Sequence, residues 1–503
     1  MAFNKISDNQ NLKKMKLFLI ILLCLTGSSL FSQSNPQTGT KKVIISGKIA
    51  DSLATTITKT PYIEFYENYN RENPDDCKTI PLKIVDGQFK VRIDLNNEIG
   101  YFTIKGIGKR DIRSVTYYQL MVTQGDSLFM KIDGENKVQF SGRGAEKMNY
   151  QHWAGDLLVS DLFIMKSDDS NSLQELISIN RKNTVWHLAL ALDSLNKISS
   201  ITDLRIKDVL RTNTASGITK NYLNSITRPY YFQDTTYLSK LKNEVNFLIT
   251  QQNGFVITDP FVIKNAFMYL QYIFELNKAV GMIKYKSDMA PINFVYQNIK
   301  KEYDGLLRDK LIPFCFLESA SLDTGALRYL PEAITIIKDL DSKRILQQLI
   351  ASKSTGSRAY EFSLIGVKGE SINLDDFKGK IVILKTYENG CIPCVWLSEN
   401  LHPVAEHFKF RTDVVFLNVN GVQVDDKSFI AGVKLGVYGT KKSIYARTRG
   451  LGQKDPFFLF YKFTAFPSMI IIGKNGKLIS GNPGKPHDDD TRLAFIKLIE
   501  NNL

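Results

Sequence analysis

The spacing of apolar residues divides the chain into three stretches of different period. From residue 42 to about residue 144, short segments alternate apolar and polar residues and are separated by turn residues. The clearest turn is Asp86-Gly87, which lies between two alternating segments and is typical of a tight β-hairpin. Period-two segments at this spacing predict an N-terminal antiparallel β-sandwich over residues 42–144.

The second stretch, residues 145–350, has the period of helices and contains few glycines. Asp259 followed by Pro260 is a typical N-cap and first-turn pair, so a helix is predicted over the apolar run 261–276. Pro331 predicts the start of another helix. We expect a helical middle domain or spacer here, with its apolar stripes forming a core.

The third stretch, residues 353–503, alternates strand and helix patterns, which is typical of a layered α/β domain. The residues before it, 351–358, are rich in Ser, Lys and Gly and predict a linker. The strands are expected at 381–386, 414–419 and 469–472, and the helices at 394–408 and 491–502. The segment 421–464 is longer than a plain crossover needs and predicts an extra helix and loop.

The N-terminal segment 1–32 has the order of features of a secretory signal peptide. Lysines precede the apolar run 17–25, and small or polar residues follow it. The run is too short to span a bilayer as a mature helix. We predict cleavage after Ser32 and an exported product in the periplasm or cell envelope, with either Met1 or Met15 as the start.

A lipid anchor is the alternative to a cleaved, soluble product. Cys24 lies inside the apolar run, but Leu23 immediately before it is too large for a lipoprotein cleavage site. We therefore expect the signal peptide to be removed without lipidation.

Length, composition and charge narrow the function classes. A chain of 503 residues predicts about three domains, and 43% hydrophobic with 23% charged residues excludes a largely disordered chain. The formal charge of +14 is compatible with nucleic-acid binding, but export places most nucleic acids out of reach. We expect no nucleic-acid partner, and instead a basic surface that suits acidic proteins or an anionic membrane surface.

The chemistry is expected at Cys391-Ile-Pro-Cys394, where a strand pattern runs into a helix pattern. A cysteine at a helix N-terminus has a lowered pKa, because the helix dipole and free N–H groups stabilise its thiolate. The second cysteine lies one turn away, and Pro393 fits the first turn. Cys391 is therefore the expected nucleophile and Cys394 the resolving thiol of dithiol–disulfide exchange.

A C-x-x-C pair also occurs in zinc sites and structural disulfides. Zinc needs two further ligands, and the nearest histidines, His402 and His407, lie within the following helix pattern at unsuitable spacing. We expect no metal and no cofactor. Cys77 and Cys315 lie in other predicted domains and are expected to be structural or free.

The C-terminal motifs resemble those of thioredoxin-like thiol-disulfide oxidoreductases of the TlpA/ResA class, over about residues 353–503. The resemblance rests on DFKGK at 376–380 before the strand, the C-x-x-C, FPSMIII at 466–472 and KNGK at 474–477. It implies a C-terminal α/β thioredoxin-like fold in a multi-domain exported enzyme. The segment 42–144 also resembles the N-terminal domain of such proteins.

The same resemblance assigns site residues and partners. Pro467, after Phe466, is implied to be cis and to lie against the dithiol, where a substrate strand can pair with the backbone. The implied activity is reduction or isomerisation of protein disulfides. Protein thiols and disulfides, with an upstream thiol electron donor in the cell envelope, are the implied partners.

The chain departs from the family pattern near the dithiol. Members usually carry a tryptophan directly before the first cysteine, whereas this chain has Gly390 there and Trp396 after the pair. Thioredoxin has a buried aspartate six residues before the first cysteine, and this chain has Lys385. Lys385 is expected either to extend to water or to lower the thiol pKa, and Glu388 is the nearest carboxylate that can accept a proton.

Two other functions remain open from the sequence. A peroxiredoxin-like peroxidase needs Thr and Pro upstream of its cysteine, and residues 387–390 supply neither. A binding or scaffold protein with an appended thioredoxin-like domain is the alternative of a different class, because most of the chain lies outside residues 353–503.

Overall fold

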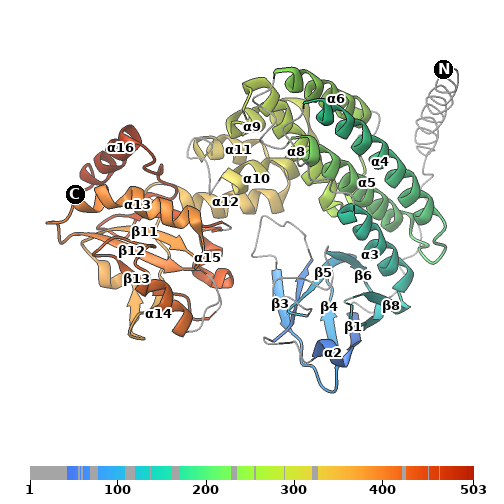
Figure 1. Ribbon diagram of the computed structural model, residues 1–503, viewed down its shortest axis with the longest axis horizontal. Helices are drawn as coiled ribbons and strands as arrows, with labels where there is room; N and C mark the ends of the chain where they lie inside the picture. Colours follow the sequence, from blue (N-terminus) through green and yellow to red (C-terminus); the bar gives the residue numbers. More distant parts are fainter. Residues whose placement is uncertain are drawn as a thin grey trace.

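The computed structural model describes residues 42–503, apart from short gaps within that range. The gaps are 55–56, 58–59, 68–76, 108–118, 136, 161–169, 228–234, 254–256, 288, 320–326, 422–425, 451 and 464. The predicted signal peptide, with Cys24 and Ser32, lies outside the described residues. The chain forms several domains that contain both sheets and helices (Figure 1).

The N-terminal domain contains two four-stranded sheets, ordered β4-β1-β7-β8 and β3-β2-β5-β6. Its elements are β1 (Lys42–Ile49), α2 (Asp51–Ala54), β2 (Tyr62–Tyr66), β3 (Cys77–Pro81), β4 (Gln88–Asp94), β5 (Ile99–Lys105), β6 (Leu120–Thr123), β7 (Ser127–Ile132) and β8 (Val138–Arg143). Buried side chains of both sheets form one hydrophobic cluster. The Asp86-Gly87 turn has positive φ at both residues, 49° and 70°, as a tight hairpin turn requires.

The prediction of a purely antiparallel arrangement is wrong at one pair, because β1 and β7 run parallel. The chain reaches β7 from β6 in the other sheet. The turn between them lies beside the start of β1, where Gly125 N donates to Lys42 O at 3.1 Å and Ile44 N donates to Asp126 O at 2.9 Å. Since β7 begins where β1 begins, the two strands point the same way.

The described residues between Ala145 and Lys353 are mainly helical and pack around one large apolar cluster. Its elements are α3 (Ala145–Ser160), α4 (Ser170–Asn196), α5 (Leu204–Ile226), α6 (Thr235–Asn253), α7 (Pro260–Asn265), α8 (Phe267–Tyr285), α9 (Ile292–Glu302), α10 (Gly305–Ser319), η3 (Leu327–Tyr329), α11 (Leu330–Ile336) and α12 (Leu340–Lys353). Asp259 caps α7 and Pro331 lies in the first turn of α11, as predicted. None of the helices in the described part of the chain combines the length and apolar character needed to cross a membrane.

The helix predicted over 261–276 is interrupted at Ala266, whose backbone is not helical. The interruption is held by polar contacts from distant elements. Tyr101 Oη of β5 donates to Asn265 O at 2.6 Å, and Met268 N donates to Asn213 Oδ1 at 3.0 Å. A local apolar pattern contains no sign of these tertiary hydrogen bonds.

The C-terminal domain is a seven-stranded sheet in the order β10-β9-β13-β12-β11-β14-β15, with helices on both faces (Figure 1). Its elements are β9 (Ser363–Gly366), β10 (Ser371–Asn373), η4 (Leu374–Phe377), β11 (Ile381–Tyr387), α13 (Ile392–His407), β12 (Val414–Asn420), α14 (Asp426–Lys434), β13 (Ile444–Arg447), η5 (Gly452–Lys454), α15 (Pro456–Phe460), β14 (Met469–Ile472), β15 (Leu478–Ser480) and α16 (Asp489–Glu500). The central strands β11, β12 and β13 are parallel, and β14 is antiparallel to β11. The extra helix predicted within 421–464 corresponds to α14 and α15.

Side chains of β11 alternate between two apolar layers, as strand geometry requires. Val382 and Leu384 belong to the cluster on one face of the sheet. Ile381 and Ile383 belong to the cluster on the other face, where Leu397 of α13 and Phe495 of α16 pack against them. By this alternation, Lys385 follows Ile381 and Ile383 on the face that α13 and α16 cover.

The segment predicted as a linker, 351–358, is bound to the C-terminal sheet. Helix α12 continues to Lys353, so the first three of these residues are helical. Beyond it, Gly356 N donates to Leu478 O at 2.8 Å and Ala359 N donates to Gly476 O at 2.9 Å. The composition resembles that of a linker, but the backbone groups pair with the edge of the sheet at β15.

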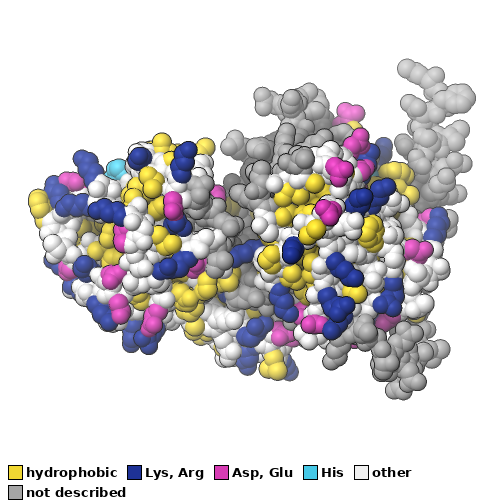
Figure 2. Space-filling model, turned by 90° about the horizontal axis from the view of Figure 1, so that it is seen from below, with side chains coloured by type: hydrophobic (Ala, Val, Ile, Leu, Met, Phe, Trp, Pro, Cys, Tyr) yellow, Lys and Arg dark blue, Asp and Glu magenta, His cyan; other side chains and the backbone are white. Residues whose placement is uncertain are grey.

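The N-terminal sheets also touch the C-terminal domain. Lys454 Nζ lies 3.2 Å from Glu64 Oε1, donates to Thr79 Oγ1 at 2.7 Å, and lies 4.2 Å from the ring centroid of Tyr62. On the face drawn in Figure 2, basic and acidic side chains of the described residues are interspersed.

Lys353 lies at the joint between α12 and the C-terminal domain, and its replacement is expected to stabilise the protein. Its side chain is buried, with Nζ 4.6 Å from the ring centroid of Phe463, and burial lowers its pKa to about 7. Because the unfolded chain binds this proton up to about pH 10.4, stability rises as the pH increases from about 7 to 10. Below pH 7 the full cost of the buried charge is present.

Lys353→Met removes this cost, so it should raise the free energy of unfolding at pH 7 by roughly 2–5 kcal/mol, the lower figure allowing for the lost cation–π contact. The gain should shrink toward pH 10. Urea unfolding at pH 7 and pH 10 measures both effects. A variant less stable than the wild type at pH 7 would contradict the assignment of a buried, penalised amine.

Candidate functional site

The two cysteines lie where the central strand β11 passes into helix α13. Cys391 is the N-cap residue of α13, with extended backbone angles of φ −78° and ψ 102°, and Pro393 lies in the first turn. Proline is favoured there because the first turn leaves its N–H positions unpaired. The sequence therefore begins the helix at the residue after Cys391, and Cys394 follows one turn along.

The sulfurs differ in their surroundings. They form a disulfide with the Cα atoms 5.3 Å apart. Cys391 is 9% exposed and Cys394 is fully buried, so Cys391 is the more accessible of the two. The Cys391 Sγ accepts a hydrogen bond from Cys394 N at 3.1 Å, which is a contact that stabilises a thiolate at a helix N-terminus.

Gly390 replaces the tryptophan that the resembled family carries, and its backbone explains the difference. Its φ is +85°, a conformation that residues with a side chain adopt only with strain. Gly390 N donates to Tyr438 Oη at 2.7 Å. The Tyr438 ring stacks on that of Tyr387, with centroids 4.9 Å apart. The turn before the dithiol is therefore hydrogen-bonded to one member of a stacked pair of aromatic rings.

Lys385 does not extend to water, and the prediction that it might do so is wrong. The residue is 1% exposed and lies beneath the first turns of α13. Its Nζ donates to Tyr438 O at 2.7 Å and to Ser398 Oγ, and lies 3.5 Å from Cys394 O. Burial lowers the pKa of Lys385 to about 7, because the charged form loses its hydration.

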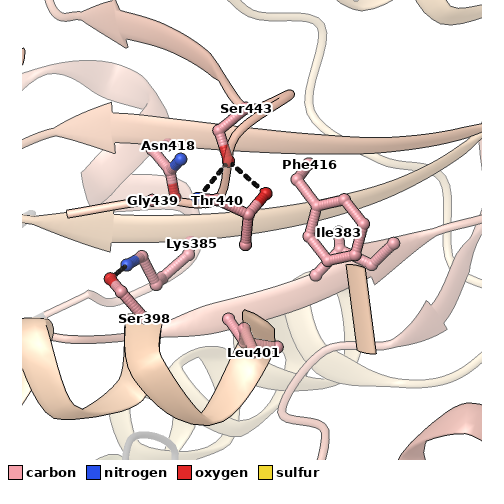
Figure 3. A pocket seen from close by; sticks show the side chains of 9 residues that line it. All are labelled: Ile383, Lys385, Ser398, Leu401, Phe416, Asn418, Gly439, Thr440 and Ser443. Atoms are coloured by element: carbon pink, nitrogen blue, oxygen red, sulfur yellow. Dashed lines mark hydrogen bonds between the residues drawn. The ribbon is translucent and has the colours of Figure 1, made fainter. Parts of the chain in front are cut away.

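A small hollow adjoins the Lys385 amine between α13, the sheet and the loop before β13 (Figure 3). Lys385 and Ser398 point toward each other from β11 and α13, and Asn418, Thr440 and Ser443 line the opposite side. The Thr440 and Ser443 hydroxyls are 3.0 Å apart. The hollow is large enough for a water-sized molecule and too small for an organic substrate.

Phe466 packs against the cluster that contains the dithiol, and Pro467 follows it in the chain. Contact between Pro467 and the dithiol stays a prediction. The peptide bond between Phe466 and Pro467 is cis. Thr386 N donates to Ser468 O at 2.8 Å, and Ser468 N donates to Thr386 Oγ1 at 2.9 Å. These bonds hold the start of β14 at the end of β11, and Phe466 packs against the cluster that contains both cysteines.

The remaining predicted residues lie around the helix start. Glu388 is half-buried, and its backbone carbonyl accepts a hydrogen bond from Cys391 N at 3.3 Å. The proton-acceptor role of its carboxylate stays a prediction. Pro393 is exposed, and Trp396 is 61% exposed, as is Ile392 one turn before it. Trp396 therefore lies on the outer face of α13, away from the buried sulfur.

Three contributors to the site were missed from the sequence. Ser398 is four residues after Cys394, and this helical spacing was a signal that could have identified it. Tyr438 lies in an irregular loop far from the motif, and no local pattern indicated it. Tyr387 is the last residue of β11 and is buried in the cluster that contains both cysteines. This burial raises the pKa of its hydroxyl well above the usual range.

Gly421 leaves room for the Phe466 ring, and its replacement is expected to disturb the site. A methyl group there would overlap the rings of Phe466 and Phe458. Gly421→Ala should therefore cost about 1–3 kcal/mol of stability and lower the rate of disulfide reduction by moving Phe466. Thermal unfolding and an insulin-reduction assay measure the two effects. Gly484→Ala, which meets open space, is the matched control, and equal effects of both variants would contradict the proposed packing role.

The described residues contain no group of three or more His, Cys, Asp or Glu side chains placed to hold a metal. Cys77 lies on β3, and Cys315 is buried in the helical core. His402 Nε2 bonds Gly439 O at 3.1 Å, and His407 Nε2 lies 2.9 Å from Glu500 Oε1. The two histidines thus have separate partners.

No model of a known protein family matches the sequence, and a search among curated proteins finds no match. Solved structures match part of the chain. One is the thioredoxin domain of a thiol-disulfide oxidoreductase from Bacteroides vulgatus, with 23% identity over 29% of this chain and 97% of that one, and a TM-score of 0.25. Another is a thiol:disulfide interchange protein from a Bacteroides species, with 21% identity over 30% of this chain and 92% of that one, and a TM-score of 0.25.

A third match is a thiol-disulfide oxidoreductase from Bacteroides fragilis, with 16% identity over 28% of this chain and 99% of that one, and the same TM-score of 0.25. These proteins are each covered almost completely, whereas about 70% of this chain has no counterpart in them. At such identities and TM-scores the likeness alone assigns no activity.

Proposed function

We propose that this protein is an exported thiol-disulfide oxidoreductase that exchanges its Cys391–Cys394 dithiol with disulfides of other proteins. The observation that carries the proposal is the position of the two sulfurs. Cys391 caps a helix and is the more accessible sulfur, and Cys394 is buried one turn inside the same helix. The N-terminal pattern of residues 1–32 supports export.

The exchange proceeds in two steps that conserve electrons. In the first, the Cys391 thiolate attacks one sulfur of the substrate disulfide, which forms a mixed disulfide and releases the other substrate sulfur as a thiolate. In the second, the Cys394 thiolate attacks Cys391 Sγ, which breaks the mixed disulfide and releases the second substrate thiol. The substrate gains two electrons, and the chain is left with the Cys391–Cys394 disulfide.

The surface around Cys391 suits a protein substrate. Ile392 and Trp396 present exposed apolar area on α13, and the half-buried Phe466 adjoins the dithiol cluster. An unfolded or extended polypeptide offers apolar side chains to such a surface and backbone groups to the segment around Pro467. The small hollow at Lys385 offers no comparable room, so the substrate disulfide is expected to approach from outside.

Reduction or isomerisation is proposed as the direction, because the motifs resemble those of the TlpA/ResA class. An upstream thiol donor in the cell envelope would then restore the dithiol. The direct test of the function is reduction of insulin by dithiothreitol with and without the protein. Acceleration is the expected result. A protein that gives no acceleration while remaining folded would favour the scaffold alternative.

A further inference from the structure

We propose that the hollow between α13, the sheet and the loop before β13 is a binding site for one halide ion, such as chloride. Its polar lining includes Lys385 of β11, Asn418 of β12, and Thr440 with Ser443 of the loop (Figure 3). Lys385 and Asn418 are direct partners in the parallel pairing of β11 with β12, so both side chains lie on the face that α13 covers. The site does not depend on the proposed redox function.

A buried hydrogen-bond donor without a partner points to a ligand in this hollow. Asn418 is 3% exposed, and its Nδ2 atom has no hydrogen-bond partner among the described residues. A buried N–H group that lacks an acceptor destabilises the fold, and native proteins therefore supply one. Because Asn418 lines the hollow, we infer that this acceptor enters the hollow from solvent.

The backbone oxygens beside the hollow already accept hydrogen bonds. Tyr438 O accepts from Lys385 Nζ at 2.7 Å. Gly439 O accepts from His402 Nε2 at 3.1 Å. These carbonyl groups are therefore engaged by other donors, and the unpartnered Asn418 amide has to bind an acceptor from outside the chain.

The hydroxyl pair of Thr440 and Ser443 supplies a second donor. The two oxygens are 3.0 Å apart, so one hydroxyl donates to the other. Ser443 Oγ also accepts from Thr440 N at 2.8 Å. Each hydroxyl carries one proton, and the pair uses only one of them internally. The other proton can join the Asn418 amide in binding a single acceptor.

The charge around the hollow favours an anion over a neutral acceptor. The contacts of Lys385 Nζ are two carbonyl oxygens and a hydroxyl, none of which neutralises an ammonium. The loop adds Lys441 and Lys442, and Glu406 of α13, whose pKa they lower, is hydrogen-bonded to Lys409. An anion in the hollow need not touch Lys385, because Coulomb attraction acts over several ångströms in a buried site.

The size of the hollow restricts the anion to a single atom. The space admits a water-sized sphere, and chloride is only slightly larger than a water molecule. Phosphate, sulfate and carboxylates are too large. Ile383, Leu401 and Phe416 form the apolar part of the lining and offer no side-chain acceptor that would compete with the ion. The half-buried Ser443 marks the side from which the ion enters.

Bromide tests the site directly, because its anomalous scattering distinguishes it from water. Crystals of the full-length, oxidised protein soaked in sodium bromide should give an anomalous peak in the hollow, beside Asn418 Nδ2 and the hydroxyl pair. A hollow that contains only water under these conditions would overturn the proposal.

Line broadening of the chloride magnetic resonance measures binding by the full-length protein in solution. At about pH 6, where Lys385 with its pKa of about 7 is mostly charged, the wild type should give excess broadening that saturates with chloride and is reversed by bromide. Asn418→Asp replaces the donor with a carboxylate, so it should lower the chloride affinity about 100-fold or more, because a like charge then faces the ion.

Asn475→Asp is the matched control, since it adds the same charge in the exposed turn between β14 and β15. It should keep the saturable broadening of the wild type. Saturable broadening that persists in Asn418→Asp would overturn the proposal, because the ion would then bind elsewhere. Equal loss in both variants would overturn it as well, since any added negative charge would have the same effect. If Asn418→Asp does not fold, the bromide peak in the wild type decides the question.

Discussion

Replacing Cys391 with serine is expected to abolish the acceleration of insulin-disulfide reduction by the protein and leave the rate of dithiothreitol alone, because an alcohol cannot replace a thiolate as the attacking group. Serine keeps the N-cap position of α13, since its oxygen can accept the helix N–H that Cys391 Sγ now accepts. The fold should therefore survive the substitution. Turbidity of precipitating insulin B chain measures the rate.

Cys77→Ser is the matched control for this experiment. Cys77 is half-buried on β3, in the N-terminal sheets, and has no place in the proposed exchange. Its replacement should leave the rate unchanged. Turnover that survives in Cys391→Ser would contradict the assignment of Cys391 as nucleophile, and turnover lost in Cys77→Ser would show that a third sulfur is required.

The second large effect is expected for Cys394→Ser. Without the resolving thiol, the mixed disulfide at Cys391 has no internal route to completion, so it should accumulate when the variant meets a disulfide substrate. Its lifetime should increase by about 100-fold or more over the wild type, because intramolecular attack gains from a high effective concentration. Non-reducing electrophoresis followed by mass spectrometry of the linked peptides detects the product.

The trapped peptide identifies the attacking sulfur. Linkage through Cys391 is the expected result, because Cys391 is the more accessible sulfur and lies at the helix N-terminus. The reciprocal variant, Cys391→Ser, should trap little substrate through the buried Cys394. Stronger trapping by that variant would reverse the two roles.

The pattern of the sequence predicted the elements that carry the dithiol. The strand at 381–386 and the helix after Cys394 are present as β11 and α13, and β14 has the predicted bounds 469–472. These elements have strong periodicity and clear boundaries, since Pro393 marks the helix start. The spacing of the cysteines itself indicated redox chemistry. Local signals of this kind survive in the fold because no tertiary contact opposes them.

Features that depend on distant contacts were not predictable from the sequence. Lys385 donates hydrogen bonds to Tyr438 O, in an irregular loop, and to Ser398 Oγ on α13. A lone lysine in a strand pattern predicts a surface residue. Its burial follows from the packing of α13 over the sheet, which the local pattern does not indicate. The parallel pairing of β1 with β7 and the interruption at Ala266 have the same origin in contacts between separate parts of the chain.

The central claim is that electrons pass between the Cys391–Cys394 pair and a protein disulfide, and one measurement tests it most directly. Fully reduced protein is mixed with insulin in the absence of any other thiol, the reaction is quenched with an alkylating reagent, and the masses of both proteins are followed. The prediction is that one insulin disulfide is lost for each chain in which Cys391 and Cys394 become protected from alkylation together. The claim would be contradicted if insulin lost no disulfide. It would also be contradicted if other cysteines of the chain became oxidised while Cys391 and Cys394 still reacted with the alkylating reagent.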